Sequence, residues 1–167
     1  SMPLAFTYPL MKRFTYWPQL FLGITFNYGL ILGWTSISEQ LDIIPFIFYF
    51  GAIFWTLGYD TIYGYQDIQD DEIIGLKSTS IKFKGTEKSF LTICYSILIF
   101  SLLIGGYQMN FNKYYYIFLI LPISHLIFYQ IKLFDSKNPN NCLKIFKSNN
   151  YLGLLILISI FIGKNYL

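Results

Sequence analysis

The sequence from residue 43 to residue 72 reads IIPFIFYFGAIFWTLGYDTIYGYQDIQDDE. Residues 43–59 contain no Lys, Arg, Asp or Glu, whereas residues 60–72 contain four aspartates and one glutamate. A hydrocarbon core about 30 Å thick requires about 20 mostly apolar helical residues. This stretch therefore predicts a helix that crosses a membrane and ends in an acidic segment at one membrane surface.

The rest of the chain repeats the apolar pattern. Hydrophobic residues form 54% of the 167 residues and charged residues only 13%, which is about half the charged share of a soluble protein. These proportions exclude a disordered chain and argue against a soluble domain. We expect an all-α transmembrane bundle of about five spans, preceded by the end of a sixth helix, in a single transmembrane domain over residues 1–167. The sixth helix would occupy 2–10, and the other spans 17–37, 89–109, 114–131 and 151–163, with a kink at Pro122.

The basic residues are distributed unequally between the two membrane surfaces. Ten of the twelve fall in segments 8–16, 65–88 and 132–150, and the other two are Lys113 and Lys164. Basic loops stay in the cytoplasm during insertion, so we expect these three segments to be cytoplasmic in a bacterial inner membrane. The lysines of the last segment could equally serve as an insertion signal only. A net charge of +3 is too small to indicate nucleic-acid binding.

The acidic segment is the most informative part of the chain. If the helix continues through it at 100° per residue, four aspartates and the Tyr63 phenol share one face. No Lys or Arg occurs between residues 60 and 72, and like charges at this spacing destabilise a helix. A hard divalent cation such as Mg²⁺ would relieve the repulsion and commonly binds one or two carboxylates plus a substrate phosphate. The predicted metal ligands are Asp67, Asp70 and Asp71; the alternative is a solvated acidic helix end.

Groups suited to binding anions surround this segment. Lys77 and Ser78 follow it, and lysines and hydroxyls can pair with diphosphate oxygens. Lys12 and Arg13 lie on the same predicted surface, and a guanidinium can bind a carboxylate through two parallel hydrogen bonds. His125 has no second His or Cys at ligand spacing, so we expect a packed, hydrogen-bonded histidine there.

Three separated motifs resemble one known family. The aspartate pattern Asp60-Thr61-Ile62-Tyr63, followed by Asp67, Asp70, Asp71 and Lys77-Ser78-Thr79, resembles the second aspartate-rich motif of the UbiA superfamily of intramembrane prenyltransferases. Residues 8–15 (YPLMKRFT) with Pro18-Gln19, and residues 149–153 (NNYLG), are similar to its 4-hydroxybenzoate polyprenyltransferase branch.

The resemblance implies a helical membrane enzyme of ubiquinone biosynthesis. Such an enzyme transfers a polyprenyl chain from its diphosphate to the ring carbon of 4-hydroxybenzoate ortho to the hydroxyl, using Mg²⁺ held between two aspartate-rich motifs. The first motif and about four of the family's usual nine spans have no counterpart here. The chain is therefore expected to resemble the carboxyl-terminal half of the enzyme, with an incomplete active site and a possible amino-terminal partner half.

The resemblance also implies roles for individual residues. The allylic cation formed during transfer would be stabilised by aromatic faces, for which Phe54, Trp55, Tyr59 and Tyr63 are candidates. An inactive membrane fragment, a related enzyme with another acceptor and a divalent-cation transporter are the alternatives. The implied catalytic residues are Asp60, Tyr63, Asp67 and Asp71, and the implied substrate-binding residues are Lys12, Arg13, Lys77, Ser78, Asn149 and Asn150.

Overall fold

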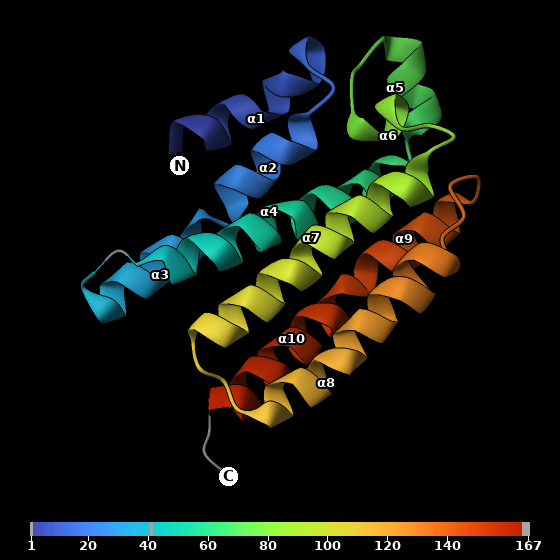
Figure 1. The fold of residues 1–167 in the computed structure, drawn as a ribbon. Helices are drawn as coiled ribbons and strands as arrows, with labels where there is room; N and C mark the ends of the chain where they lie inside the picture. The colour runs from blue at the N-terminus through green and yellow to red at the C-terminus, as the bar shows by residue number, and fades with distance from the viewer. Residues whose placement is uncertain (1, 41, 165–167) are drawn as a thin grey trace.

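A computed structural model describes residues 2–40 and 42–164, and for residues 2–5, 8 and 9 the backbone alone. In this part of the chain all regular structure is helical (Figure 1). The helices are α1 (Met2–Phe14), α2 (Pro18–Phe26), α3 (Tyr28–Ser38), α4 (Ile43–Gly64), α5 (Ile68–Ile74), α6 (Thr79–Lys82), α7 (Glu87–Gln108), α8 (Lys113–Ser124), the π-helix η1 (His125–Lys132), α9 (Pro139–Lys147) and α10 (Asn149–Lys164).

Five segments of the described chain are long and apolar enough to cross a membrane, as the sequence predicts. Three of them combine two helices: α2 with α3, α8 with η1, and α9 with α10. The expected helix at 2–10 is also confirmed as α1, although it extends to Phe14. The bounds of the five segments are Pro18–Ser38, Ile43–Gly64, Glu87–Gln108, Lys113–Lys132 and Pro139–Lys164.

The last span begins twelve residues earlier than the predicted start at 151, so the prediction of a loop over all of 132–150 is wrong. Pro139 occupies the first turn of α9, and the Asn138 side chain accepts a hydrogen bond from the backbone N–H of Asn141, which are two standard helix-starting features. α9 buries Cys142 and Ile145 and exposes its lysines. A search for uninterrupted apolar runs misses such an amphipathic helix.

The centre of the bundle is the pair α4 and α7, which lie side by side in Figure 1. Gly58 of α4 faces Tyr95 of α7, and a Cβ at this glycine would lie 2.6 Å from a carbon of the Tyr95 ring. Gly51 similarly faces Ser101, whose hydroxyl donates to the Ile47 carbonyl. Small residues at such contacts let membrane helices approach closely, and here they fix the position of α4 just before its acidic end.

The helix that contains Pro122 changes its winding rather than ending. α8 continues through Pro122, and three residues later the chain adopts the π-helix η1. Proline removes a backbone donor and crowds the preceding turn, so the sequence predicted a kink; the structure records a change of helix type after Pro122. Gln130, fully buried in η1, accepts a hydrogen bond from the Tyr95 hydroxyl at 3.0 Å and thereby joins η1 to α7.

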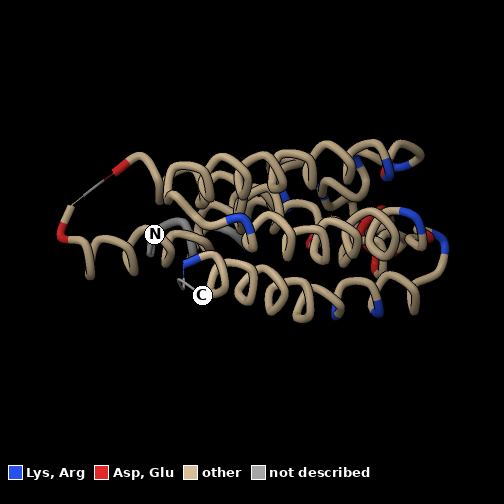
Figure 2. The backbone as a smooth tube through the Cα atoms, turned by 60° about the horizontal axis from the view of Figure 1, so that its bottom comes forward, with Lys and Arg blue, Asp and Glu red and all other residues tan. Residues whose placement is uncertain are grey.

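Charged residues gather at one end of the bundle (Figure 2). Seven of the nine acidic residues and ten of the twelve basic residues lie in α1, in the segments from the end of α4 to the start of α7, or between η1 and the end of α9. The opposite end carries Glu39, Asp42, Lys113 and Lys164. The helices thus place the acidic segment and the basic loops at the same end of the molecule.

Candidate functional site

The acidic segment does not form one continuous helix, and the prediction of a single carboxylate face is wrong. α4 ends at Gly64 and α5 begins at Ile68. Gly64 packs so closely on the Ser80 side chain that no Cβ would fit, and the next residue, Tyr65, is buried against Phe134. These tertiary contacts turn the chain, so Asp60 belongs to α4 whereas the other aspartates begin α5.

The aspartates of α5 have a local role as well. Asp67 is the N-cap residue, and Asp70 and Asp71 lie in the first turn. Carboxylates at a helix N-terminus interact favourably with the helix dipole and its free N–H groups. Gly75, with φ 76°, ends the helix in the left-handed conformation that glycine adopts readily. Part of the acidic pattern is therefore explained by the formation of this short helix.

A basic partner for the acidic segment comes from a distant part of the chain. Lys12 Nζ lies 3.3 Å from Asp71 Oδ2, and the Asp71 side chain is only 11% exposed. Lys12 also acts electrostatically on the half-buried Asp60. In addition, the Lys12 carbonyl accepts a hydrogen bond from the Lys77 N–H at 2.7 Å. α1 thus connects both aspartates to the loop that carries Lys77.

The residues of the acidic segment would supply only part of the ligand shell of a metal ion. Among residues 2–40 and 42–164, no group of three or more Asp, Glu, His or Cys side chains lies close enough to hold a metal ion. Asp67 and Asp70 are exposed, whereas Asp71 is buried beside Lys12. The oxygen donors suit a hard divalent ion that takes one or two carboxylates and completes its shell with phosphate and water. They do not form a cage made of protein ligands alone.

The loop after α5 is held by a buried polar network. Thr61 Oγ1 of α4 lies 2.6 Å from Thr79 Oγ1, and Ser80 donates to the Thr61 carbonyl at 2.8 Å. The Gln19 side chain of α2 accepts from the Thr79 N–H at 3.1 Å. All four residues are at most 3% exposed. Because unpaired buried polar groups are costly, this network fixes the loop that carries Lys77 against α2 and α4.

Two of the predicted substrate-binding residues in this loop differ in exposure. The Lys77 ammonium is partly exposed and lies 5.7 Å from the centre of the Tyr16 ring. Ser78 is 1% exposed, and its hydroxyl accepts from the Ile81 N–H as the N-cap of α6. Lys77 is therefore placed to meet an anion directly, whereas the contribution of Ser78 visible in the structure is to shape the loop.

An aromatic pocket lies between α4 and the last span. It has a volume of about 270 Å³, and its lining includes Trp55, Tyr59 and Phe146. The Phe146 ring lies 5.8 Å from the Tyr59 ring and 4.8 Å from the Tyr63 ring, measured between ring centres. Asn149 and Asn150 line the same pocket. The predicted residues of α4 and of the last span are thus brought together here.

The motif at 149–153 holds the Trp55 ring in place. Trp55 Nε1 donates to Asn149 Oδ1 at 2.9 Å. One turn further along α10, Gly153 leaves room for the same ring, because a Cβ there would lie 3.2 Å from Trp55 Cη2. Trp55 therefore contacts two residues, Asn149 and Gly153, that follow it by 94 and 98 positions in the sequence.

Trp55 also lines a second, apolar cavity of about 390 Å³. This cavity lies among α3, α4, α7 and α10, and its lining contains no charged residue. Trp34, Phe48 and Leu102 are representative members of its wall. A polar, charged end, an aromatic middle and an apolar chamber therefore follow one another along α4, an arrangement that suits an amphiphile with an anionic head.

The remaining predicted residues are solvent-accessible. Arg13 and Asn150 are exposed, and Tyr63 is 42% exposed although it contacts Phe146. The side chains of Tyr8 and Pro9, part of the motif at 8–15, lie outside the described part of the structure. The sequence motifs include Gln19 and Thr79 without indicating the hydrogen bond between them, and Phe146 belongs to none of the motifs.

The fold and this site define a multi-pass helical membrane protein with an acidic and basic site at one end and an apolar chamber behind it. The profile of the UbiA prenyltransferase family matches residues 1–159, and the chain belongs to this family. Prenyltransferases of the family generally depend on a divalent metal ion.

Several relatives cover nearly the whole chain. It is 42% identical to the mitochondrial 4-hydroxybenzoate polyprenyltransferase of Bos taurus, over 98% of this chain and 44% of that protein. It is 40% identical to 4-hydroxybenzoate geranyltransferase 2 of Lithospermum erythrorhizon, over 97% of this chain and 53% of that protein. The chain thus spans about half the length of these relatives. No solved structure matches it significantly.

Proposed function

We propose that this chain forms the second half of a 4-hydroxybenzoate polyprenyltransferase of ubiquinone biosynthesis, as a single transmembrane domain over residues 1–167. The observation that carries the proposal is the continuous path along α4. The Asp71–Lys12 pair and Lys77 lie at the charged end, Trp55 and Tyr59 line the aromatic pocket, and an apolar chamber begins at the same Trp55. The printed names of the relatives support the choice of donor and acceptor.

The proposed reaction separates charge, and the two ends of the path suit the two products. Cleavage of the allylic C–O bond leaves the electron pair on the diphosphate and a carbocation on the isoprenoid. Lys77 and Lys12 would bind the diphosphate through charge-assisted hydrogen bonds. The faces of Tyr59, Tyr63 and Trp55 would stabilise the cation, by about 2 kcal/mol or more for a desolvated contact. The apolar chamber would hold the rest of the isoprenoid chain.

The acceptor completes the reaction by carbon–carbon bond formation. The ring carbon ortho to the hydroxyl attacks the cation, and the proton on that carbon then passes to the released diphosphate or to water, which restores the aromatic ring. We assign Asp60 to the acceptor hydroxyl, because it is half-buried on α4 between Tyr59 and Tyr63. Arg13 is assigned to the acceptor carboxylate, and Asn149 and Asn150 to the wall of the binding pocket.

The proposed metal ion is Mg²⁺. Asp67 and Asp71, with Asp70 beside them, would hold it together with the diphosphate, and it would neutralise the charge that develops on the leaving group. Because the described residues contain no complete ligand cluster, further ligands from the diphosphate and from the family's first aspartate-rich motif are required. This requirement agrees with a chain that spans about half of its relatives.

The intact protein that contains this chain provides the direct test. Membranes carrying it should convert geranyl diphosphate and 4-hydroxybenzoate into 3-geranyl-4-hydroxybenzoate in the presence of MgCl₂, detected by mass spectrometry. A parallel reaction with the naphthoate acceptor of menaquinone biosynthesis, or with haem, tests for a different acceptor within the family. The proposal fails if membranes with the bovine relative form the product and those with this protein do not.

The alternative of an inactive fragment is tested by supplying the part of the relatives that this chain does not span. We expect no transfer by residues 1–167 alone and measurable transfer when an amino-terminal half with the first aspartate-rich motif is co-expressed. Transfer by residues 1–167 alone would contradict the requirement for a second set of ligands. The cation-transporter alternative is not favoured, because the acidic residues cluster at the ends of the spans.

For the location, we propose a bacterial inner membrane with the charged end of the bundle in the cytoplasm. The support is the collection of ten basic residues at that end. Relatives such as the bovine protein are named as mitochondrial, which makes a mitochondrial membrane the alternative.

A Lys137→Cys variant in intact cells should resist a membrane-impermeant maleimide, and labelling from outside would reverse the orientation. Cys94 and Cys142 are fully buried and should contribute little background.

A further inference from the structure

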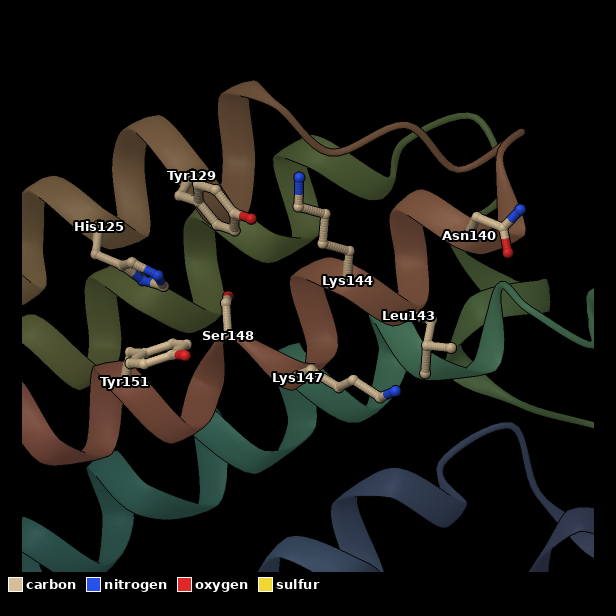
Figure 3. Close-up of a pocket in the computed structure, with 8 residues that line it drawn as sticks. All are labelled: His125, Tyr129, Asn140, Leu143, Lys144, Lys147, Ser148 and Tyr151. Carbon is tan, nitrogen blue, oxygen red and sulfur yellow. The ribbon is translucent and has the colours of Figure 1, made fainter.

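A second polar cavity shares no lining residue with the acidic segment. It lies between η1 and the junction of α9 and α10 and has a volume of about 620 Å³. Figure 3 shows His125 and Tyr129 on one wall, Ser148 and Tyr151 on the facing wall, and Lys144 extending between them. None of the lining residues is acidic, and two of them are lysines, Lys144 and Lys147.

The positive charge in this cavity is not neutralised by the protein. Both lysines are exposed, and neither takes part in an ion pair or a side-chain hydrogen bond within the described part of the chain. By contrast, Lys84, which lies near α5, forms an ion pair with Glu72, with 2.7 Å between Lys84 Nζ and Glu72 Oε1. Lys144 and Lys147 are three residues apart on α9 and lie at the charged end of the bundle, where a membrane surface would be.

The floor of the cavity is rigidly built. Gln130 Nε2 donates to Ser148 Oγ at 3.0 Å and to the Ile145 carbonyl at 3.3 Å. Ser148 in turn donates to the Ile145 carbonyl at 2.6 Å. Gln130 and Ser148 are both buried. Hydrogen bonds from Gln130 therefore fix the distance between η1 and the junction of α9 and α10, the two walls of the cavity.

One residue in the wall of the cavity, His125, has a polar atom without a partner. His125 Nδ1 is buried and makes no hydrogen bond in the structure, although the sequence predicted a hydrogen-bonded histidine. Its ring is stacked on Tyr129, with 5.2 Å between the ring centres. A buried nitrogen without a partner loses its interaction with water and gains nothing in return. A ligand atom at this position would remove that cost.

The cavity continues into an apolar surface. Tyr151 is 70% exposed, and Leu154 and Ile158, which lie on the same side of α10 at helical spacing, are 53% and 38% exposed. On the other wall, Leu121 lies one turn before His125 and is 52% exposed. The acyl chains of a diacyl lipid with its phosphate in the cavity would lie along this surface, whereas a small soluble anion would make no contact with it.

We propose that this cavity binds the phosphate headgroup of an anionic phospholipid, with Lys144 and Lys147 holding the phosphate and its acyl chains lying along α8 and α10. Basic pockets between membrane helices suit such headgroups. The shared chemistry is a phosphate anion, and the apolar surface favours the lipid over free phosphate as its source. Lys147 also lines the aromatic pocket between α4 and the last span, so the two cavities adjoin at α9, although lipid binding does not require the prenyl-transfer reaction.

Native mass spectrometry of the intact protein in detergent tests this proposal. Titration with dioleoyl phosphatidylglycerol should give a bound lipid at lower concentration than titration with dioleoyl phosphatidylcholine. Lys144→Gln should weaken phosphatidylglycerol binding by about fivefold, the usual contribution of one basic side chain at an anionic lipid surface. Lys137→Gln, an exposed lysine outside the cavity, is the matched control and should bind as the unaltered protein does.

Two more measurements separate the possible explanations. His125→Phe keeps the stacked ring and removes the unpaired nitrogen, so it should weaken phosphatidylglycerol binding about twofold to threefold while leaving the protein folded. Inorganic phosphate at millimolar concentration should not displace the lipid. Equal binding of the two lipids, equal effects of Lys144→Gln and Lys137→Gln, or full displacement by inorganic phosphate would each overturn the lipid assignment.

Discussion

The two parts of the candidate site are built differently. In the aromatic pocket, Trp55 is fixed by a hydrogen bond from its indole to Asn149 and by the space left at Gly153. In the acidic segment, the aspartates are divided between α4 and α5, and an ion pair between Lys12 and Asp71 links α5 to α1. The Trp55 ring is therefore held by contacts within the described residues, whereas the carboxylates of these residues do not form a complete metal site.

This difference shows which parts of such a site are ordered by the packing of the fold itself, before any substrate or metal ion binds. Rings and amides in the bundle are ordered by contacts that also stabilise the fold, so removing one costs both stability and function. The exposed carboxylates of Asp67 and Asp70 stabilise α5 only locally and bury little surface. Substitutions in the two regions should therefore separate activity from stability, which the following predictions test in order of decreasing effect.

The largest effect is expected for Asp71→Asn. The amide keeps the shape and loses the charge, so transfer by the intact protein should fall about 100-fold to 1000-fold, as for other losses of charge stabilisation in a transition state. The melting temperature should change little, because the Lys12 side chain is 37% exposed and keeps its water. Glu72→Gln, whose partner Lys84 is well exposed, is the control; equal rates in the two variants would remove Asp71 from the metal site.

A smaller effect on rate, but a clear effect on stability, is expected for Asn149→Ala. This change removes the acceptor for Trp55 Nε1 and the hydrogen bond from Asn149 Nδ2 to the Phe146 carbonyl. Unfolding should become easier by about 1–2 kcal/mol, and transfer should fall about tenfold because the ring loses its fixed orientation. Thermal unfolding in detergent and steady-state kinetics measure both; a stability equal to that of Asn150→Ala would contradict the anchoring of Trp55.

Arg13→Ala tests the acceptor assignment. Arg13 is exposed and makes no ion pair within the described residues, so the fold should not depend on it. If it binds the carboxylate of 4-hydroxybenzoate, its removal should raise the KM for the acceptor about tenfold and leave the KM for geranyl diphosphate unchanged. An unchanged acceptor KM would reject the assignment.

The smallest effect is expected for Gly153→Ala. The added methyl group would lie 3.2 Å from Trp55 Cη2, so the ring must shift by a few tenths of an ångström. Transfer should fall about twofold to threefold, with a stability change below about 1 kcal/mol. An activity loss as large as that of Asn149→Ala would mean that the space around the ring matters more than its hydrogen bond, and kinetics of the two variants side by side decide this.

The sequence predicted the spans well and the form of the site less well. Apolar runs of membrane length identify spans directly, so the five spans were predicted, although the amphipathic helix α9 was not. The assumption of one helix through residues 60–72 failed because the turn after Gly64 depends on Ser80 and Phe134, residues 16 and 70 positions away. Helical periodicity contains no information about such contacts.

The amino-acid sequence by itself determined the membrane character of this protein, the collection of charges at one end and the motifs that relate it to the UbiA family. These properties depend on residue type and local spacing, which a linear pattern records. The tertiary structure alone decided that Lys12 neutralises Asp71, that Asn149 and Gly153 hold Trp55, and that His125 lies unpaired in a basic cavity. Each of these depends on segments far apart in the chain, which meet only because burial of the apolar helix faces brings them together.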